Sequence, residues 1–346
     1  FHPAADAAEQ AARIARELSD GDALARAALL VFVRGPESGG PFARVVALLE
    51  EAEARSRSAS SPLRARVLAR LSNELFFVPG TLDRRVALSD EAFELASGAD
   101  LETRIFVGYY GCIGGWSRLR ATERAARMEE LIALADELGD TSVRFLVSAP
   151  YIASHLECGR LERVDVEIDR LSRRVESLSV PSYFSWYAPL YRSMRALYEG
   201  QFADAERLAN LARELSRRAR TQDSARNFVG QLTTLRLEQG RPNEIEEFLR
   251  GIRQQERRTS IIRAALLRTL AECGKSDEAR AELEKWRREG FPGPLDDTNG
   301  VISLMLLGGV CFTEGAQAAA ADVMQRLERY AGENAAATFG HVCLGP

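Results

Sequence analysis

One stretch of the sequence decides the fold: Leu197-Tyr198-Glu199-Gly200-Gln201-Phe202-Ala203-Asp204-Ala205. It is followed by Leu208, Ala209, Ala212 and Leu215 at spacings of three and four residues, so that one face of this segment is apolar and small. A glycine between two amphipathic segments provides the left-handed residue that ends one helix and lets the chain reverse into the next. The stretch therefore predicts a helical hairpin that turns at Gly200.

Glycines of this kind recur along the whole chain. They are Gly35, Gly80, Gly115, Gly159, Gly200, Gly240, Gly274 and Gly315, in steps of 45, 35, 44, 41, 40, 34 and 41 residues. Recurrence at a period of roughly 20 to 50 residues is typical of repeat arrays, in which each unit packs on its neighbours. No segment shows the alternation of polar and apolar residues that marks a β-strand. The sequence predicts one elongated all-α domain over residues 1–346, built from about eight helical hairpins.

Composition, charge and cysteine usage exclude several classes of protein. The chain has 346 residues, 46% hydrophobic and 28% charged, which suffices for a core and argues against disorder. A net charge of −4 argues against the broad phosphate neutralisation on which direct nucleic-acid binding depends. The longest apolar stretches, 105–116 and 301–312, are shorter than the ~20 residues that span a bilayer. Five cysteines without a CxxC pair indicate neither a disulfide framework nor a zinc site, so we expect reduced thiols and a cytoplasmic protein.

Two patterns resemble enzyme motifs, and each has a simpler interpretation. Gly274-Lys275-Ser276 is the end of a phosphate-binding loop, but Thr269 stands where the first glycine belongs and a helix, not a strand, precedes the pattern. We therefore expect a turn between helices. His155 and Cys158 lie three residues apart on one helical face, which suits a thiolate–imidazole pair, yet no suitable third group is near in sequence. The sequence predicts a chain that is not an enzyme and carries no metal or cofactor.

Glycines are dense in Gly108-Tyr109-Tyr110-Gly111-Cys112-Ile113-Gly114-Gly115-Trp116. Glycine inside a helix costs about 1 kcal/mol relative to alanine, so another interaction has to offset that cost. Close packing of helices, whose backbones approach where side chains are missing, is one explanation. A ligand cleft beside Tyr109, Tyr110 and Trp116 is the other.

Several motifs together carry a family resemblance. Gly200, Phe202, Ala205, Ala209 and Ala212 match the turn and second helix of a tetratricopeptide repeat. From Arg104 to Pro346 the chain also resembles the tetratricopeptide-like region of large bacterial signalling proteins, through Pro181-Ser182-Tyr183-Phe184-Ser185-Trp186-Tyr187, Glu199-Gly200-Gln201-Phe202-Ala203-Asp204-Ala205-Glu206, Glu238-Gln239-Gly240-Arg241, Gly290-Phe291 and Cys343-Leu344-Gly345-Pro346. Those proteins carry an AAA-type or STAND ATPase module and an output domain. The output domain is a class III adenylate or guanylate cyclase or a LuxR-type DNA-binding domain.

The resemblance implies a fold and a role. The fold is a right-handed α-solenoid of about eight tetratricopeptide-like helical hairpins. The role is that of a non-catalytic protein–protein interaction scaffold, the sensor arm of a bacterial signalling or transcriptional regulator, with an adjoining ATPase and output domain as partners. Because the chain opens on Phe1 without an initiator methionine, we expect it to be a fragment of such a multidomain protein. The alternative role is a receptor for a small-molecule effector bound inside the superhelical groove.

The candidate binding site follows from aligning Gly200 with the tetratricopeptide turn. The alignment places Tyr187, Tyr191, Met194 and Tyr198 at first-helix positions that usually face the inner groove, and the next repeats add Asn227, Gln231 and Arg268. Rigid aromatic rings, amides and an arginine suit an extended peptide or a small-molecule effector in a concave groove. The alternative is that these aromatic residues, together with Tyr183, Phe184 and Trp186, belong to the core.

Overall fold

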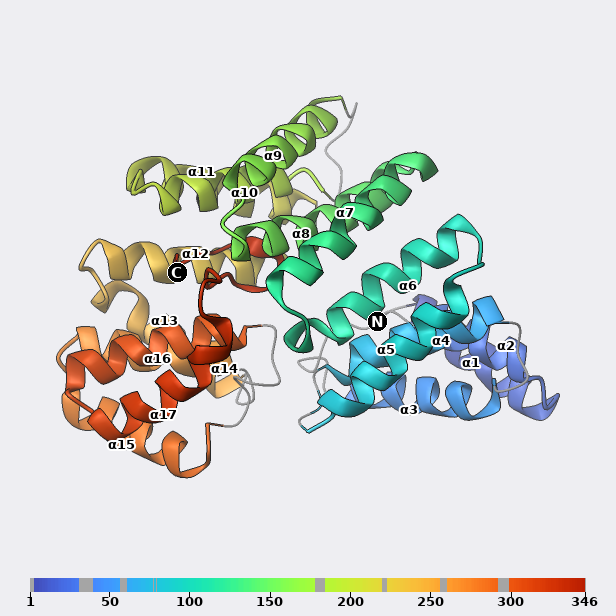
Figure 1. Ribbon diagram of the computed structural model, residues 1–346, viewed down its shortest axis with the longest axis horizontal. Helices are drawn as coiled ribbons and strands as arrows, with labels where there is room; N and C mark the ends of the chain where they lie inside the picture. Colours follow the sequence, from blue (N-terminus) through green and yellow to red (C-terminus); the bar gives the residue numbers. More distant parts are fainter. Residues whose placement is uncertain are drawn as a thin grey trace. The chain divides into compact units, whose positions relative to one another are not determined.

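The computed structural model describes residues 3–30, 40–56, 61–76, 78, 80–177, 184–219, 223–255, 260–291 and 299–345. Within these ranges the regular structure is helical, apart from one isolated antiparallel bridge between Ala336 and Cys343 (Figure 1). The predicted all-α class is therefore confirmed for this part of the chain. The chain divides into two compact units, Phe1–Leu119 with Ala133–Leu138 (unit 1) and Arg120–Ile132 with Gly139–Pro346 (unit 2). The single elongated array over residues 1–346 stays a prediction.

Unit 1 is a bundle of amphipathic helices around a core rich in leucine and alanine. Leu24, Leu49, Leu68 and Leu71 are completely buried in that core. The helices are α1 (Pro3–Glu17), α2 (Gly21–Leu30), α3 (Gly40–Arg55), α4 (Ser61–Leu75), α5 (Leu82–Ala96) and α6 (Leu101–Gly114), followed by the 3₁₀ turn η2 (Trp116–Arg118). Helix α4 packs against both α5 and α6, which places it at the centre of the unit.

Unit 2 contains the remaining helices and the C-terminal residues. The helices are α7 (Ala121–Leu138, whose last turns are assigned to unit 1), α8 (Thr141–Glu157), α9 (Leu161–Glu176), α10 (Tyr187–Tyr198), α11 (Phe202–Arg218), α12 (Asp223–Glu238), α13 (Asn243–Gln255), α14 (Ser260–Glu272), α15 (Ser276–Arg288), α16 (Gly300–Glu314) and α17 (Gln317–Leu327), with the 3₁₀ turns η3 (Glu328–Tyr330) and η4 (Thr338–Gly340). Each of α8, α10, α12, α14 and α16 packs against the helix that follows it.

The glycine turns that pair these helices share one geometry. At Gly200 the main-chain N–H bonds to the carbonyl of Leu197 at 3.1 Å, and the N–H of Gln201 bonds to that of Ala196 at 2.8 Å. This pair of bonds is the Schellman motif, which satisfies the last carbonyls of a helix and requires a left-handed residue, here Gly200 with φ of 74°. The same two bonds recur around Gly159, Gly240, Gly274 and Gly315.

The predicted hairpin turns are therefore confirmed at most of the predicted glycines. Gly80, Gly159, Gly200, Gly240, Gly274 and Gly315 all have φ between 63° and 74°, and they stand between α4 and α5, α8 and α9, α10 and α11, α12 and α13, α14 and α15, and α16 and α17. The prediction is wrong at Gly115, where φ is −93° and the chain continues into η2. Gly35 lies outside the described residues. Gly139 between α7 and α8 is also left-handed, as are Gly290, Gly332, Gly340 and Gly345, and none of these five was among the predicted turns.

The glycine-rich segment of α6 serves close packing. A β-carbon at Gly114 would lie 2.9 Å from the main-chain carbonyl carbon of Ser72 in α4, and one at Gly111 would lie 3.1 Å from the Ser89 hydroxyl in α5. That hydroxyl donates to the Gly111 carbonyl at 2.9 Å. Trp116 is buried, with 4% of its surface exposed. The close-packing explanation is therefore confirmed, and these contacts give no support to the cleft.

Candidate functional site

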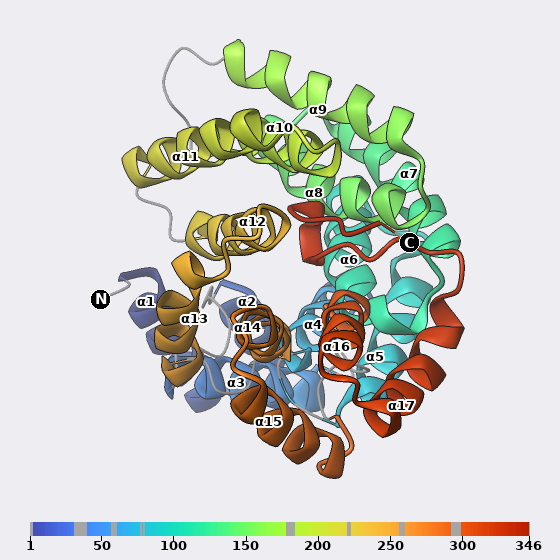
Figure 2. The ribbon, with the colours of Figure 1, turned by 90° about the vertical axis from the view of Figure 1, so that its left-hand side faces the viewer.

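The candidate site lies in unit 2, where residues 331–345 form a largely non-helical stretch, here called the C-terminal segment. Figure 2 shows this segment in red beside α8, α12 and α16. It contacts Ile152 and Leu156 of α8, Gly230 of α12 and Ile302 of α16. We call the surfaces of α8, α10, α12 and α16 that contact the segment, together with the start of α7, the inner face.

The C-terminal segment folds largely on itself. The Ala335 N–H bonds to the Gly345 carbonyl at 2.8 Å, the Leu344 N–H to the Ala335 carbonyl at 2.9 Å, and the Ala337 N–H to the Val342 carbonyl at 2.9 Å. The turn of this small hairpin contains Phe339 and Gly340, with φ of 65° and 70°. A left-handed conformation is uncommon for a residue with a large side chain, so the surroundings must hold Phe339 in place.

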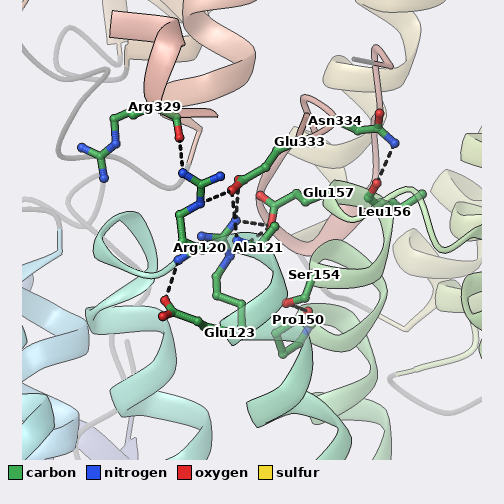
Figure 3. A network of polar contacts seen from close by, with 11 residues as sticks. Arg120, Ala121, Glu123, Pro150, Ser154, Leu156, Glu157, Arg329, Glu333 and Asn334 are labelled. Atoms are coloured by element: carbon green, nitrogen blue, oxygen red, sulfur yellow. Dashed lines mark hydrogen bonds and ion pairs between the residues drawn. The ribbon is translucent and has the colours of Figure 1, made fainter. Parts of the chain in front are cut away.

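The first anchor of the segment is Glu333, which binds the beginning of α7 (Figure 3). Its Oε1 accepts the main-chain N–H of Ala121 at 3.2 Å and lies 3.2 Å from Nε of Arg120. Its Oε2 lies 3.6 Å from Nη2 of Arg124. The first N–H groups of a helix have no partner within the helix and carry partial positive charge, so a carboxylate is the favoured partner there.

Arg124 joins this anchor to a buried ion pair. Its Nη2 donates to Oε2 of Glu157 at 2.6 Å, and its Nε donates to the same oxygen at 3.1 Å. The side chains of Arg124 and Glu157 are only 2% and 5% exposed. Removing one member of such a buried pair typically costs about 3 to 5 kcal/mol, because the other charge is left without compensation. The carbonyl of Arg329, just before the segment, also accepts from Nη1 of Arg120 at 2.8 Å.

The second anchor is Asn334, which binds the end of α8. Its main-chain N–H donates to the Glu157 carbonyl at 2.8 Å, and its side-chain Nδ2 donates to the Leu156 carbonyl at 2.8 Å. The Leu156 carbonyl also accepts the Gly159 N–H at 2.9 Å, and a carbonyl oxygen can accept two hydrogen bonds, so Asn334 adds a second bond at this helix end. Glu333 and Asn334 therefore bind the start of one helix and the end of the next.

The third group of contacts comes from α10 and α12. The Tyr191 hydroxyl donates to the Phe339 carbonyl at 2.9 Å, and Nε2 of Gln231 donates to the His341 carbonyl at 2.9 Å and to the Leu190 carbonyl at 2.8 Å. Both side chains are at least 98% buried. Oε1 of Gln231 is also buried and accepts no hydrogen bond from the residues that the structure describes.

Small residues let the segment approach the helices closely. Ala335, Ala336 and Ala337 are each 1–2% exposed. A β-carbon at Gly340 would lie 3.0 Å from Cγ2 of Ile152, and one at Gly230 would lie 3.0 Å from Nε2 of His341. The contacts at both glycines leave too little room for a larger side chain unless a neighbour moves.

The structure brings two of the seven predicted site residues onto the segment, namely Tyr191 and Gln231. Met194 is buried, with 1% of its surface exposed. Tyr187 is half-buried among aromatic rings, with ring centroids 4.5 Å from Trp186 and 6.1 Å from Tyr191. Tyr191 thus serves both the aromatic cluster and the segment.

The other three predicted residues are Tyr198, Asn227 and Arg268. Tyr198 lies at the end of α10 beneath the guanidinium of Arg195, which is 5.7 Å from the ring centroid. Asn227 is half-buried in α12. Arg268 donates from Nη1 to the Thr313 hydroxyl at 3.2 Å and packs over Gly309 of α16. Tyr183 lies outside the described residues.

Burial shifts the pKa values of His155 and Cys158. It lowers the pKa of His155, although Glu129 opposes this effect from 3.3 Å. It raises the pKa of the Cys158 thiol. A lowered thiol pKa favours a reactive thiolate, so these directions give no support to a thiolate–imidazole pair. The His155 ring lies against Tyr151, with the ring centroids 4.2 Å apart.

The Gly274-Lys275-Ser276 pattern lies at a turn between α14 and α15. Gly274 ends α14 with φ of 72°, and Lys275 forms an ion pair with Glu246 at 2.6 Å, so the predicted turn between helices is confirmed. Among the described ranges no group of three or more His, Cys, Asp or Glu side chains is arranged to hold a metal ion. None of the helices described is long and apolar enough to cross a bilayer.

No local pattern in the sequence indicates that Arg120, Arg124 and Glu157 form one network with Glu333 and Asn334. Arginines and glutamates occur throughout the chain, and Arg120 and Glu333, which meet here, are 213 residues apart. The one available signal was Gly332, which ends the preceding helical turns and is followed directly by Glu333 and Asn334.

Comparison with known proteins adds no family to this picture. No protein-family model matches the chain, and the comparison with curated proteins gave no significant match.

Proposed function

We propose that this chain is a non-catalytic binding scaffold whose inner face in unit 2 holds a non-helical protein segment through its main chain. One observation carries the proposal. Two buried side chains, the Tyr191 hydroxyl and the Gln231 amide, donate to main-chain carbonyls of a non-helical segment. Main-chain recognition combined with pockets for selected side chains is a recurring way in which proteins bind extended peptides.

The proposed architecture extends this chemistry to the whole chain. In it, the helix pairs are tetratricopeptide-like hairpins of a right-handed solenoid with about eight repeats. Such arrays are stabilised mainly by contacts between neighbouring repeats, and their curved surfaces suit protein binding. The resemblance to bacterial signalling proteins supports a role as the cytoplasmic sensor arm of a signalling or transcriptional regulator. There, occupancy of the inner face would be passed to an adjoining ATPase and output domain.

A second candidate is a receptor for a small molecule. The observation in its favour is the buried Oε1 of Gln231, which accepts no hydrogen bond from the described residues. A buried acceptor without a donor costs about 1 to 3 kcal/mol, so a ligand that supplies an N–H or O–H would gain affinity there. A peptide N–H supplies that donor as well, and the inner face already holds main chain. We therefore favour the peptide.

The test is to select binders from a displayed library of random peptides. The bait is the full chain, both unchanged and with Glu333→Gln, which loosens the first anchor. We expect peptides that bind either bait and lose binding when Gln231→Leu is added. Glu238→Ala, an exposed position near the end of the same helix, is the matched control and should leave binding unchanged. If neither bait enriches any peptide, or if Gln231→Leu has no effect, the proposed function is wrong.

A further inference from the structure

The inner face specifies the order of two side chains. A carboxylate at position 333 meets the N–H of Ala121 and the guanidinium of Arg120, both at 3.2 Å. An amide at 334 donates to the Leu156 carbonyl at 2.8 Å. Exchanging the two would place a negative charge against the carbonyls that end α8, where partial negative charge already accumulates. The site therefore selects an acidic residue followed by a side-chain hydrogen-bond donor, here the amide of Asn334.

The inner face also limits the size of the side chains that fit against it. The three residues after the acid–amide pair are alanines with 1–2% of their surface exposed. Six residues after Asn334, a β-carbon at Gly340 would lie 3.0–3.1 Å from Ile152, Ala153 and Leu156 of α8. The pattern that these contacts define is thus an acidic residue, Asn, three small residues, two residues for which they set no side-chain requirement, and Gly. Few segments of a given protein satisfy a pattern of this length.

Part of the main chain of the C-terminal segment is bonded within the segment and not to the helices. Its hydrogen bonds between residues 335 and 345 and between 337 and 342 are internal, so it can leave as a folded hairpin. When Glu333 leaves, Arg124 keeps its buried partner Glu157 at 2.6 Å. The segment gives Gln231 only a carbonyl, so Oε1 of this amide receives nothing from the described residues. A competing peptide that presents both a carbonyl and an N–H would satisfy Gln231 completely.

We propose that residues 333–345 are a tethered ligand of the inner face, and that the partner is a segment of another protein with the same acidic-Asn-small-small-small-x-x-Gly pattern. This inference rests on the proposed function and names the class of peptide that the inner face binds. The tether keeps its ligand at a high effective concentration, so a partner must bind strongly or arrive when the anchor is weakened. The proposed partner replaces the hairpin on the inner face.

The test uses a fluorescein-labelled synthetic peptide with the sequence of residues 331–346, in which Cys343→Ser prevents disulfide formation. Fluorescence anisotropy measures its binding to three forms of the full chain: unchanged, Glu333→Gln with Asn334→Ala, and the control Glu328→Gln. Glu328 is an exposed carboxylate just before the segment. We expect the double variant to bind the peptide at least tenfold more tightly than the unchanged chain, and the control to behave like the unchanged chain. A peptide that carries the same two substitutions should not bind to any of the three.

The outcomes separate this inference from the proposed function. If the double variant keeps the far-ultraviolet circular dichroism of the unchanged chain but does not bind the peptide, the segment is not an exchangeable ligand. If the double variant loses its helices, the segment is a permanent part of the core, and the inference is again wrong. Either failure leaves the proposed function standing if library peptides still bind in a manner that depends on Gln231. Amide hydrogen exchange gives a second measurement, because release of a tethered ligand should expose the N–H of Asn334, which bonds to the Glu157 carbonyl of α8, well before the N–H groups within α8.

Discussion

Replacing Gly340 by alanine tests how tightly the turn of the C-terminal segment fits against α8. The backbone at this position is left-handed, with φ of 70°, which costs an alanine about 1 to 2 kcal/mol. The added β-carbon would also lie 3.0 Å from Cγ2 of Ile152 and 3.1 Å from the main-chain nitrogen of Ala153. Forcing one methyl group into such a space typically costs about 1 to 3 kcal/mol more.

A matched variant separates these two effects. Gly332 is also left-handed, with φ of 84°, but a β-carbon there would meet nothing within 4 Å. Gly332→Ala therefore carries the backbone cost alone, and both variants reduce the entropy of the unfolded chain in the same way. The free energy of unfolding should be lower for Gly340→Ala than for Gly332→Ala by about 1 to 3 kcal/mol, the packing contribution alone.

Urea unfolding of the full chain gives this difference. Tryptophan fluorescence is a suitable signal, because Trp186 and Trp286 are both buried in unit 2. Far-ultraviolet circular dichroism should confirm that both variants keep the helices at zero urea. Equal free energies of unfolding for Gly340→Ala and Gly332→Ala would show that the turn does not press against α8, and the size rule for the inner face would then be wrong.

Three further predictions concern other groups. Burial lowers the pKa of His155 below the usual ~6.5. Below that pH the unfolded chain binds more protons than the folded chain, so the free energy of unfolding falls as the pH falls. The variant His155→Leu should show a smaller fall, which urea midpoints measured between about pH 5 and pH 8 would detect. Burial raises the pKa of Cys343 and Cys311 to about 11, so both thiols should react slowly with an aromatic disulfide reagent at about pH 8. Loosening the first anchor by substitution should speed the reaction of Cys343 alone, as measured by mass spectrometry of the digested chain, and equal acceleration at Cys311 would contradict a local opening. In unit 1, Gly114→Ala should lower the urea midpoint more than Gly115→Ala. A β-carbon at Gly114 would lie 2.9 Å from the main chain of Ser72, whereas one at Gly115 would lie 3.6 Å from its nearest neighbour. A similar midpoint for both variants would contradict the close-packing explanation.

The helix pairs could be predicted from sequence because their turns are local. A Schellman turn is closed by bonds that span at most five residues, such as Gln201 to Ala196, so the residues that determine it are adjacent in the chain. Gly115 shows the limit of this approach. Its N–H bonds to the Gly111 carbonyl and the chain continues into a 3₁₀ turn, although the flanking sequence resembles that of the other glycines.

The candidate site could be predicted only in part, because the C-terminal segment is far in sequence from the helices that it contacts. The tetratricopeptide alignment predicts Tyr191 and Gln231 as groove residues, and the structure places both against the C-terminal segment. The same alignment also predicts Tyr187 and Met194, but an aromatic cluster and the core take up these two side chains. Nothing local reveals that a segment following α17 returns to α8 and α10, so its anchor at Glu333 could not be foreseen.

The bond between Arg120 and the Arg329 carbonyl has a consequence for the newly made chain. These residues are 209 positions apart. A ribosome adds roughly 5 to 20 residues per second, so the start of α7 leaves the ribosome roughly 10 to 40 seconds before Glu333 and Asn334 do. During that interval the Ala121 N–H lacks its Glu333 acceptor, and the carbonyls of Leu156 and Glu157 lack the donors of Asn334, so water or another protein can take these places. The hydrogen bonds at these two helix ends are therefore completed only after most of unit 2 has been made.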